Sequence, residues 1–291
     1  MKCHRTVLLL CRALACLSLT ALPAAAQPPS PAPAAAPRIT WGWFNAAPYM
    51  IAEGPGRQLG IFDQIRSVLK EQMPEYEHKE VQAPFPRIFQ EIKNGNPWCF
   101  VGGVRSPERE KLAYFSAPVA VFLPFRVIVR KDRLAEFGGT GQVSLAALLG
   151  DPALRSSVLR GRLFTPAIDA LLKNHAPLQF HSEFNEALQM LLAKRLDYLI
   201  ELPVIANYSA HQLGREGELT ALTIGESDDA TVSNVMCART PWGKQVIERI
   251  NAVLHAQRDT PRYRRIVEHW SDEDGVRRIR ALYRQQLLNA Q

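Results

Sequence analysis

The first folded residues read ITWGWF (residues 39–44), and after them come GIFDQIRSVLKEQM (60–73), EVQ (80–82), IFQEI (88–92) and WCFV (98–101). The first, third and fifth of these runs predict strands, whereas the second and fourth carry apolar residues at helical spacing. Strands and helices that alternate in this order predict a parallel sheet with helices on its faces. The folded part therefore begins as an α/β unit.

A second alternating unit begins at residue 125. The later segments predict strands at 125–129, 157–159, 179–180, 198–200 and 233–238, and helices at 143–149, 166–173, 182–194, 204–213, 244–257 and from 262 onward. The strand–helix order thus occurs twice, which favours two α/β lobes.

The N-terminal residues have the layout of a secretory signal peptide. Basic residues at positions 2 and 5 precede an apolar stretch (7–22), and AAA at 24–26 fits an Ala-x-Ala cleavage site. The apolar stretch is shorter than the about 20 residues that a membrane-spanning helix needs. We expect export to the periplasm with cleavage near Ala26, so that residues 1–26 form the signal peptide. A weak lipoprotein-like box that ends at Cys16 leaves a lipid anchor as the alternative.

Residues 27–37, QPPSPAPAAAP, are rich in Pro and Ala and predict an extended linker. Loss of Lys2, Arg5 and Arg12 with the signal peptide lowers the formal charge from +7 to +4. Because the basic residues are scattered among acidic ones, we expect no nucleic-acid partner. Cys99 and Cys237 remain in an oxidising compartment, where they form one disulfide or stay as two buried thiols.

Several segments resemble the bacterial extracellular solute-binding proteins of the polar amino-acid type. RSPEREKLAYFSAP (105–118) is similar to the family's T-x-E-R-x-x-x-x-x-F-S-x-P segment. Residues 182–197 and 262–270 resemble its later helix–strand and closing-helix segments, and Pro48 and Gly60 fit its first loop. The resemblance extends over about residues 38–275.

The resemblance implies a periplasmic-binding-protein type II fold, with two Rossmann-like α/β lobes joined by two crossover strands. Lobe 1 would comprise residues 38–121 plus 235–291, and lobe 2 residues 125–230. The ligand would lie in the cleft that the strand-end loops of both lobes face, and the lobes would close on it about a hinge. In this topology Cys99 and Cys237 lie on neighbouring antiparallel strands, where register decides between a bridge and free thiols.

In lobe 1, the resemblance makes Arg109 the residue that binds a ligand carboxylate through its planar fork of donors. Arg105 in the same segment is either a second anion contact or a solvated charge. Phe85 packs against the solute or belongs to the core. Gly102 and Gly103 match small residues that let the backbone approach the ligand closely.

In lobe 2, Arg162 falls at the start of the family's ligand loop, and Thr165 follows it at a helix N-terminus that suits an anion. Glu201 lies one position from the family's acid that holds a ligand amino group; otherwise it is an acid at a helix start.

The sequence also departs from the family in ways that argue against a simple α-amino acid as the ligand. Trp43, Phe44 and Tyr49 predict a more aromatic pocket than amino-acid binders have, although Trp43 fits a core strand position equally well.

These observations predict a monomeric, non-enzymatic protein that binds a small carboxylate-bearing solute for ABC-type uptake through a membrane permease. We expect no metal and no cofactor, because the histidines and cysteines show no metal-ligand spacing. One alternative is a binding module that reports to a membrane sensor. Another is a dehydratase-like enzyme on the same scaffold, with Glu201 as its general acid. Neighbouring permease or kinase genes would separate transport from sensing.

Overall fold

The computed structural model describes residues 36–54, 56–139, 141–175, 179–182, 184–271 and 273–288. The predicted signal peptide and most of the predicted linker lie outside these residues. Within the described part of the chain, no helix has the length and apolar character that crossing a membrane requires.

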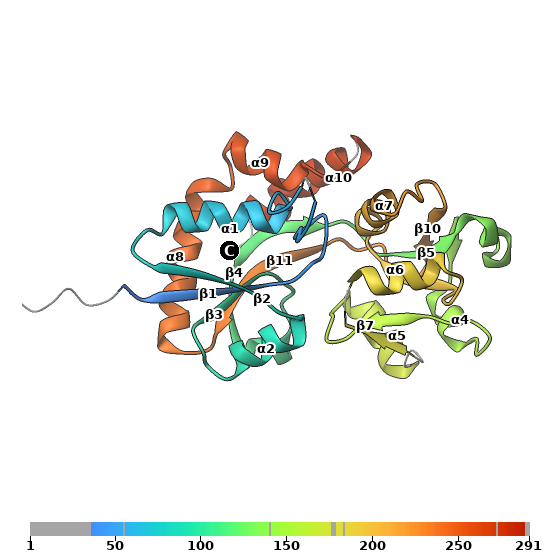
Figure 1. Ribbon diagram of the computed structural model, residues 1–291, viewed down its shortest axis with the longest axis horizontal. Helices are drawn as coiled ribbons and strands as arrows, with labels where there is room; N and C mark the ends of the chain where they lie inside the picture. The colour runs from blue at the N-terminus through green and yellow to red at the C-terminus, as the bar shows by residue number, and fades with distance from the viewer. Residues whose placement is uncertain are drawn as a thin grey trace, which may run out of the picture. The chain divides into compact units, whose positions relative to one another are not determined.

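Lobe 1 is built on a five-stranded sheet with the strand order β2-β1-β3-β11-β4. Its elements are β1 (Arg38–Trp43), α1 (Ile61–Gln72), β2 (Glu77–Gln82), α2 (Phe85–Lys93), β3 (Trp98–Gly103), α3 (Pro107–Glu110), β4 (Ala113–Phe122), β11 (Thr231–Ala238), α8 (Pro241–Gln257), α9 (Pro261–Glu268), α10 (Glu273–Tyr283) and a π-helical segment (Arg284–Leu288). β1 pairs in parallel with β2 and β3, as the alternation predicts, and β11 lies antiparallel between β3 and β4. Figure 1 shows α1 and α2 on opposite faces of this sheet.

Lobe 2 is built on a four-stranded sheet, β6-β10-β5-β9, and a separate parallel pair, β7-β8. Its elements are β5 (Arg126–Arg130), a 3-10 helix (Lys131–Phe137), β6 (Gln142–Val143), α4 (Leu145–Gly150), β7 (Ser157–Leu159), α5 (Pro166–Asn174), β8 (Gln179–His181), α6 (Phe184–Leu192), β9 (Tyr198–Glu201), α7 (Pro203–Gln212) and β10 (Leu219–Ile224). The four-stranded sheet is mixed, because β5 runs antiparallel to both β9 and β10. The larger sheet of each lobe thus has one strand, β11 in lobe 1 and β5 in lobe 2, that runs antiparallel to the other strands.

Two chain segments pass between the lobes, one from β4 to β5 and one from β10 to β11. They run side by side, since Thr231 pairs with Phe122 and Val232 pairs with Val121. Two adjacent crossing segments are the arrangement about which two lobes can rotate as a hinge.

The start of α1 shows how a buried carboxylate organises the first loop of lobe 1. Asp63 accepts hydrogen bonds from the backbone N–H groups of Ile51 (2.8 Å) and Gly60 (3.2 Å), and Arg66 donates to it at 2.9 Å. Only 2% of Asp63 is exposed. These bonds satisfy free N–H groups at the helix start and hold the preceding loop over the end of the sheet.

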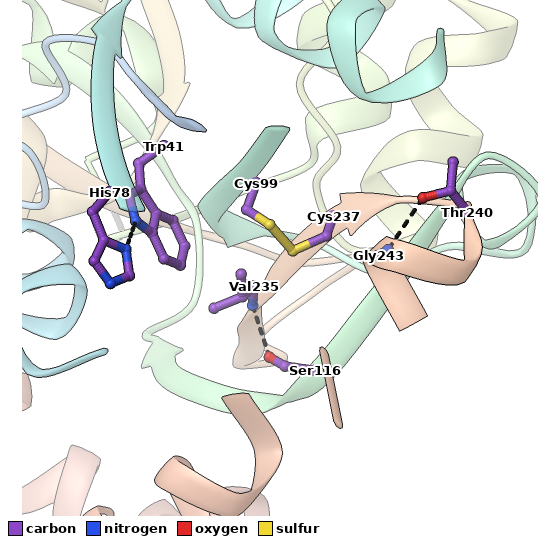
Figure 2. Close-up of a disulfide and its surroundings, with 8 residues drawn as sticks. All are labelled: Trp41, His78, Cys99, Ser116, Val235, Cys237, Thr240 and Gly243. Atoms are coloured by element: carbon purple, nitrogen blue, oxygen red, sulfur yellow. Dashed lines mark hydrogen bonds between the residues drawn. A yellow bond between two sulfur atoms is a disulfide. The ribbon is translucent and has the colours of Figure 1, made fainter. Parts of the chain in front are cut away.

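Cys99 on β3 and Cys237 on β11 form a disulfide, with both residues fully buried. The two residues stand directly opposite each other in the antiparallel ladder. Figure 2 shows the bridge together with Ser116 of β4, whose hydroxyl accepts a hydrogen bond from the Val235 N–H at 2.9 Å. β11 is thus tied to β3 and β4, from which it is distant in the sequence, inside lobe 1.

Candidate ligand-binding cleft

A cavity of about 80 Å³ lies between the two lobes, and residues of both lobes line it. Its walls are mainly apolar and include six phenylalanines: Phe44, Phe62, Phe85, Phe100, Phe122 and Phe125. Tyr49 and the two arginines Arg109 and Arg162 add the polar groups. The volume is small beside the about 300–1,000 Å³ of common ligand pockets. A solute of more than a few heavy atoms therefore requires the lobes to move apart.

The aromatic rings form two clusters on the lobe 1 side. In one cluster the Phe100 ring lies 5.7 Å from Phe44 and 5.3 Å from Phe85. In the other, the Tyr49 ring lies 5.0 Å from both Phe62 and Phe122. Such contacts hold the rings in fixed positions and give the cavity a rigid apolar surface.

Arg109 is placed in the cavity by the short helix α3. Ser106 caps this helix by accepting a hydrogen bond from the Arg109 N–H (3.3 Å), and Pro107 stands at its first position. The Arg109 guanidinium lies 5.3 Å from the centre of the Phe85 ring and 5.6 Å from that of Phe89. Only 8% of Arg109 is exposed, so this cation is enclosed by aromatic faces.

The guanidinium of Arg109 bonds only to backbone carbonyls among the described residues. Nη1 donates to the Val104 oxygen (3.1 Å), and Nη2 donates to the Gly161 oxygen of lobe 2 (2.6 Å). Burial lowers the pKa of Arg109 to about 10, against a smaller opposing effect of the Asp169 charge. The group therefore stays positive at neutral pH, and two of its five N–H donors are engaged.

Arg162 is held differently, on the lobe 2 wall. Its two terminal nitrogens donate to the two carboxylate oxygens of Glu201, at 2.5 and 2.7 Å. Glu201 ends β9, and its Oε1 also accepts from the Leu202 N–H at 2.7 Å. The side chains are 11% and 7% exposed. Arg162 and Glu201 therefore form a buried, bidentate ion pair in which both carboxylate oxygens accept hydrogen bonds.

The two glycines predicted to contact the ligand differ in position. Gly102 lines the cavity and has a φ of +111°, and a Cβ there would stand 2.5 Å from the Phe62 ring. Gly103 does not line it; a Cβ at this position would meet Met236 at 3.0 Å. Gly102 is therefore required by the backbone and by the cavity wall, whereas Gly103 is required by packing against β11.

Three further predicted residues do not line the cavity. Arg105 is exposed and donates to the Ser116 oxygen at 3.3 Å on another part of the surface. Trp43 is buried, with Arg66 over its ring at 5.9 Å. The Thr165 hydroxyl caps α5 and bonds to Ser227 at 2.9 Å, so it is already used within lobe 2. The structure thus brings Arg109, Phe85, Gly102, Phe44, Tyr49, Arg162 and Glu201 together and leaves these three, with Gly103, outside.

The sequence did not predict most of the phenylalanines that line the cavity. Phe62 lies in the first turn of α1, Phe100 lies in β3 and Phe122 ends β4, and the sequence pattern predicts ordinary core residues at these positions. Their common feature is that each lies where a lobe 1 element meets the cleft. Only the fold reveals this, because the periodicity of a strand or helix does not say which of its ends faces the other lobe.

No protein-family model matches the chain, and no curated protein is similar to it in sequence. Solved structures do match. A substrate-binding protein of an ABC uptake transporter from Streptococcus pneumoniae, with bound histidine, aligns at a TM-score of 0.64 and 17% identity, over 82% of this chain and 94% of that one. A histidine kinase sensor domain with similarity to periplasmic binding proteins aligns at a TM-score of 0.64 and 16% identity, over 80% and 95% of the two chains.

An ancestral amino-acid-binding protein, a precursor of cyclohexadienyl dehydratase, aligns at a TM-score of 0.61 and 18% identity, over 81% of this chain and 95% of that chain. These matches confirm the predicted fold: two α/β lobes of the periplasmic-binding-protein type II class, similar to the substrate-binding proteins of amino-acid ABC transporters. Identities this low establish a shared fold and leave the ligand to be argued from the cleft.

Proposed function

We propose that this protein binds a small carboxylate-bearing solute in the cleft between its lobes and delivers it for ABC-type uptake. The observation that carries the proposal is Arg109, a buried cation in an aromatic cavity with no carboxylate bound to it among the described residues. A buried charge without a counter-ion costs free energy unless a bound partner supplies the opposite charge. A ligand carboxylate is such a partner, and three donors of Arg109 remain for it.

The uptake role is supported by fold alone, through structures such as the substrate-binding protein of an ABC uptake transporter. A sensor role has comparable support from the histidine kinase sensor domain. We keep uptake as the proposal and sensing as its alternative. Deletion of the gene in the native cell should abolish uptake of the labelled ligand, whereas a sensor would leave uptake intact and abolish a transcriptional or motility response.

Catalysis by Glu201 receives no support from the geometry. A general acid must carry a proton and present it to the substrate. Both oxygens of Glu201 instead accept from Arg162, and one also accepts from the Leu202 N–H. Neither oxygen is left free to present a proton to a substrate. We therefore propose binding without turnover.

Calorimetry with the mature protein tests the carboxylate site. We expect a screen of small monocarboxylates to identify a ligand, and Arg109→Met to weaken it by about 100-fold, the loss of two charge-assisted hydrogen bonds. Methionine keeps much of the apolar volume beside Phe85 and Phe89. The matched control is Arg105→Met, an arginine four residues earlier that does not line the cavity, which should leave the affinity unchanged. Equal losses in both variants would contradict the assignment.

A further inference from the structure

The charges of the cleft are arranged unequally on its two walls. On the lobe 1 wall, Arg109 has only carbonyl partners among the described residues. On the lobe 2 wall, the positive charge of Arg162 is cancelled by Glu201. Among the residues that the structure describes, no acid lines the cavity itself. The described walls therefore present a single uncompensated charge to a ligand, and that charge is positive.

Glu201 lies next to the cavity lining, because it bonds to the lining residues Arg162 and Leu202, and it is enclosed. Arg162 covers both of its oxygens, and its guanidinium carbon lies 5.0 and 5.2 Å from the centres of the neighbouring Phe125 and Phe164 rings. The Leu202 N–H takes a further acceptor position. An ammonium group of a ligand would have to displace Arg162 from this acid, at the cost of a buried ion pair.

Asp169, a second acid near the site, is also engaged. Its Oδ1 accepts from the Phe164 N–H at 3.0 Å, and it acts on Arg109 only through space. It does not line the cavity. A ligand ammonium would consequently meet two guanidinium groups and aromatic walls. Arg109 repels an ammonium group, and the absence of a free counter-ion on the described walls disfavours burial of that charge.

We infer that the Arg162–Glu201 pair is a specificity device, which makes the cleft select small monocarboxylates with an uncharged apolar tail and reject the corresponding α-amino acids. This inference rests on the proposed function, since it takes Arg109 as the carboxylate anchor. It narrows the proposed ligand to a class that excludes zwitterionic amino acids, such as the histidine in one similar structure.

Three pairs of probes that differ only by the amino group provide the test: 3-methylbutanoate against L-valine, 4-methylpentanoate against L-leucine, and 3-phenylpropanoate against L-phenylalanine. By calorimetry on the mature protein, we expect at least one carboxylate to bind about 100-fold or more tightly than its amino acid. If an amino acid binds as tightly as its partner or more so, the inference is overturned and the carboxylate site stands. If no member of either class binds, the proposed function falls with it.

Variants of the pair sharpen the test. Arg162→Gln releases the acid, so we expect the preference for the carboxylate to fall at least about 10-fold through tighter binding of the amino acid. The double variant Arg162→Gln/Glu201→Gln removes both charges and should retain the preference, since it offers the ammonium no acid. Arg160→Gln, an exposed arginine two residues earlier over the Phe180 ring, is the matched control.

Circular dichroism establishes that each variant folds. Should Arg162→Gln fail to fold because its acid is left buried, the wild type and the double variant still decide the matter. A double variant that binds amino acids and carboxylates equally well would overturn the role of the pair.

Discussion

Different interactions stabilise the interiors of lobe 1 and lobe 2. In lobe 1 a disulfide joins Cys99 to Cys237, two residues separated by 138 positions in the chain. In lobe 2 the buried carboxylate of Asp197 accepts hydrogen bonds from Arg133 and Arg155, and a buried histidine, His181, bonds to Ser157. The two lobes should therefore unfold under different conditions. Lobe 1 should be sensitive to a reductant, and lobe 2 should be sensitive to acid.

The acid response of lobe 2 follows from two depressed pKa values. Burial raises the pKa of Asp197, but the hydrogen bonds from Arg155 and Arg133 outweigh burial and bring it from 3.8 to about 2. Burial, and next the charge of Arg162, lower the pKa of His181 from 6.5 to about 4. In both cases the unfolded state binds more protons. Stability is therefore lost as the pH falls, from about 6.5 to 4 for His181 and from about 4 to 2 for Asp197.

Lobe 1 has a buried carboxylate, Asp63, whose pKa is shifted in the opposite direction. Burial raises the pKa of Asp63 in spite of its bonds from Ile51 and Arg66, so the folded state takes up a proton more readily than the unfolded chain. Acid adds stability there. Glu80, about a quarter exposed, opposes this in part, because bonds from Lys70 and Arg66 exceed the effect of burial and lower its pKa. Acid should thus unfold lobe 2 before lobe 1.

The largest effect should come from breaking the covalent tie. Replacement of both cysteines, Cys99→Ala with Cys237→Ala, should lower the free energy of unfolding of lobe 1 by about 4–5 kcal/mol on the loop-entropy model. All five tryptophans (41, 43, 98, 242 and 270) lie in lobe 1 segments, so their fluorescence during urea unfolding measures this lobe. An unchanged urea midpoint would contradict the prediction.

The next effect concerns His181 and acid. Its pKa shift corresponds to about 3 kcal/mol of stability that is present near pH 7 and lost by pH 4. Part of the far-UV circular dichroism signal of the protein should therefore be lost in this range while tryptophan emission from lobe 1 holds. His181→Gln should move the decline to lower pH. His255→Gln, an exposed position on α8, is the control and should leave it in place. Simultaneous loss of both signals would show that the lobes unfold together.

A smaller effect should follow from Asp197→Asn. The depressed pKa of this carboxylate corresponds to about 2 kcal/mol at neutral pH, which the neutral amide forfeits. Hydrogen exchange should show faster opening of the N–H groups in β9 and the segment at Arg155, and unchanged exchange in β1 and β3. Equal acceleration in both lobes would contradict the localisation of this network to lobe 2.

Sequence reasoning predicted the alternating architecture and the residue pattern of lobe 1, because burial on both sheet faces leaves a strong apolar signal in β1, β3 and α1. It did not predict that β5 runs antiparallel to its neighbours in the lobe 2 sheet, since strand direction is set by connections and not by composition. Val143 illustrates a local error: it was expected to begin a helix but ends β6, because the Ser144 hydroxyl caps α4 one residue later, at 3.2 Å from the Ala147 nitrogen.

The candidate site was predictable in part for a similar reason. Arg109 stands out by its motif, whereas the partner of Arg162 depends on a contact between residues 39 positions apart. Sequence alone treated Arg162 and Glu201 as separate ligand contacts. Only their juxtaposition shows that they cancel each other's charge.

The smallest expected effects lie at two helix caps, one in each lobe. Thr240 caps α8 in lobe 1 by accepting from the Gly243 N–H at 3.1 Å, a bond drawn in Figure 2. Thr165 caps α5 in lobe 2 and also bonds to the buried Ser227. Thr240→Val should cost about 1 kcal/mol, the usual value of a lost cap. Thr165→Val should cost somewhat more, because it leaves the Ser227 hydroxyl buried without its partner. Urea unfolding followed by tryptophan emission should detect the first loss, and hydrogen exchange in lobe 2 the second. A smaller loss of stability in Thr165→Val than in Thr240→Val would contradict this order. It would indicate that water replaces the Thr165 hydroxyl at Ser227, and that lobe 2 is less tightly packed there than its buried polar contacts indicate.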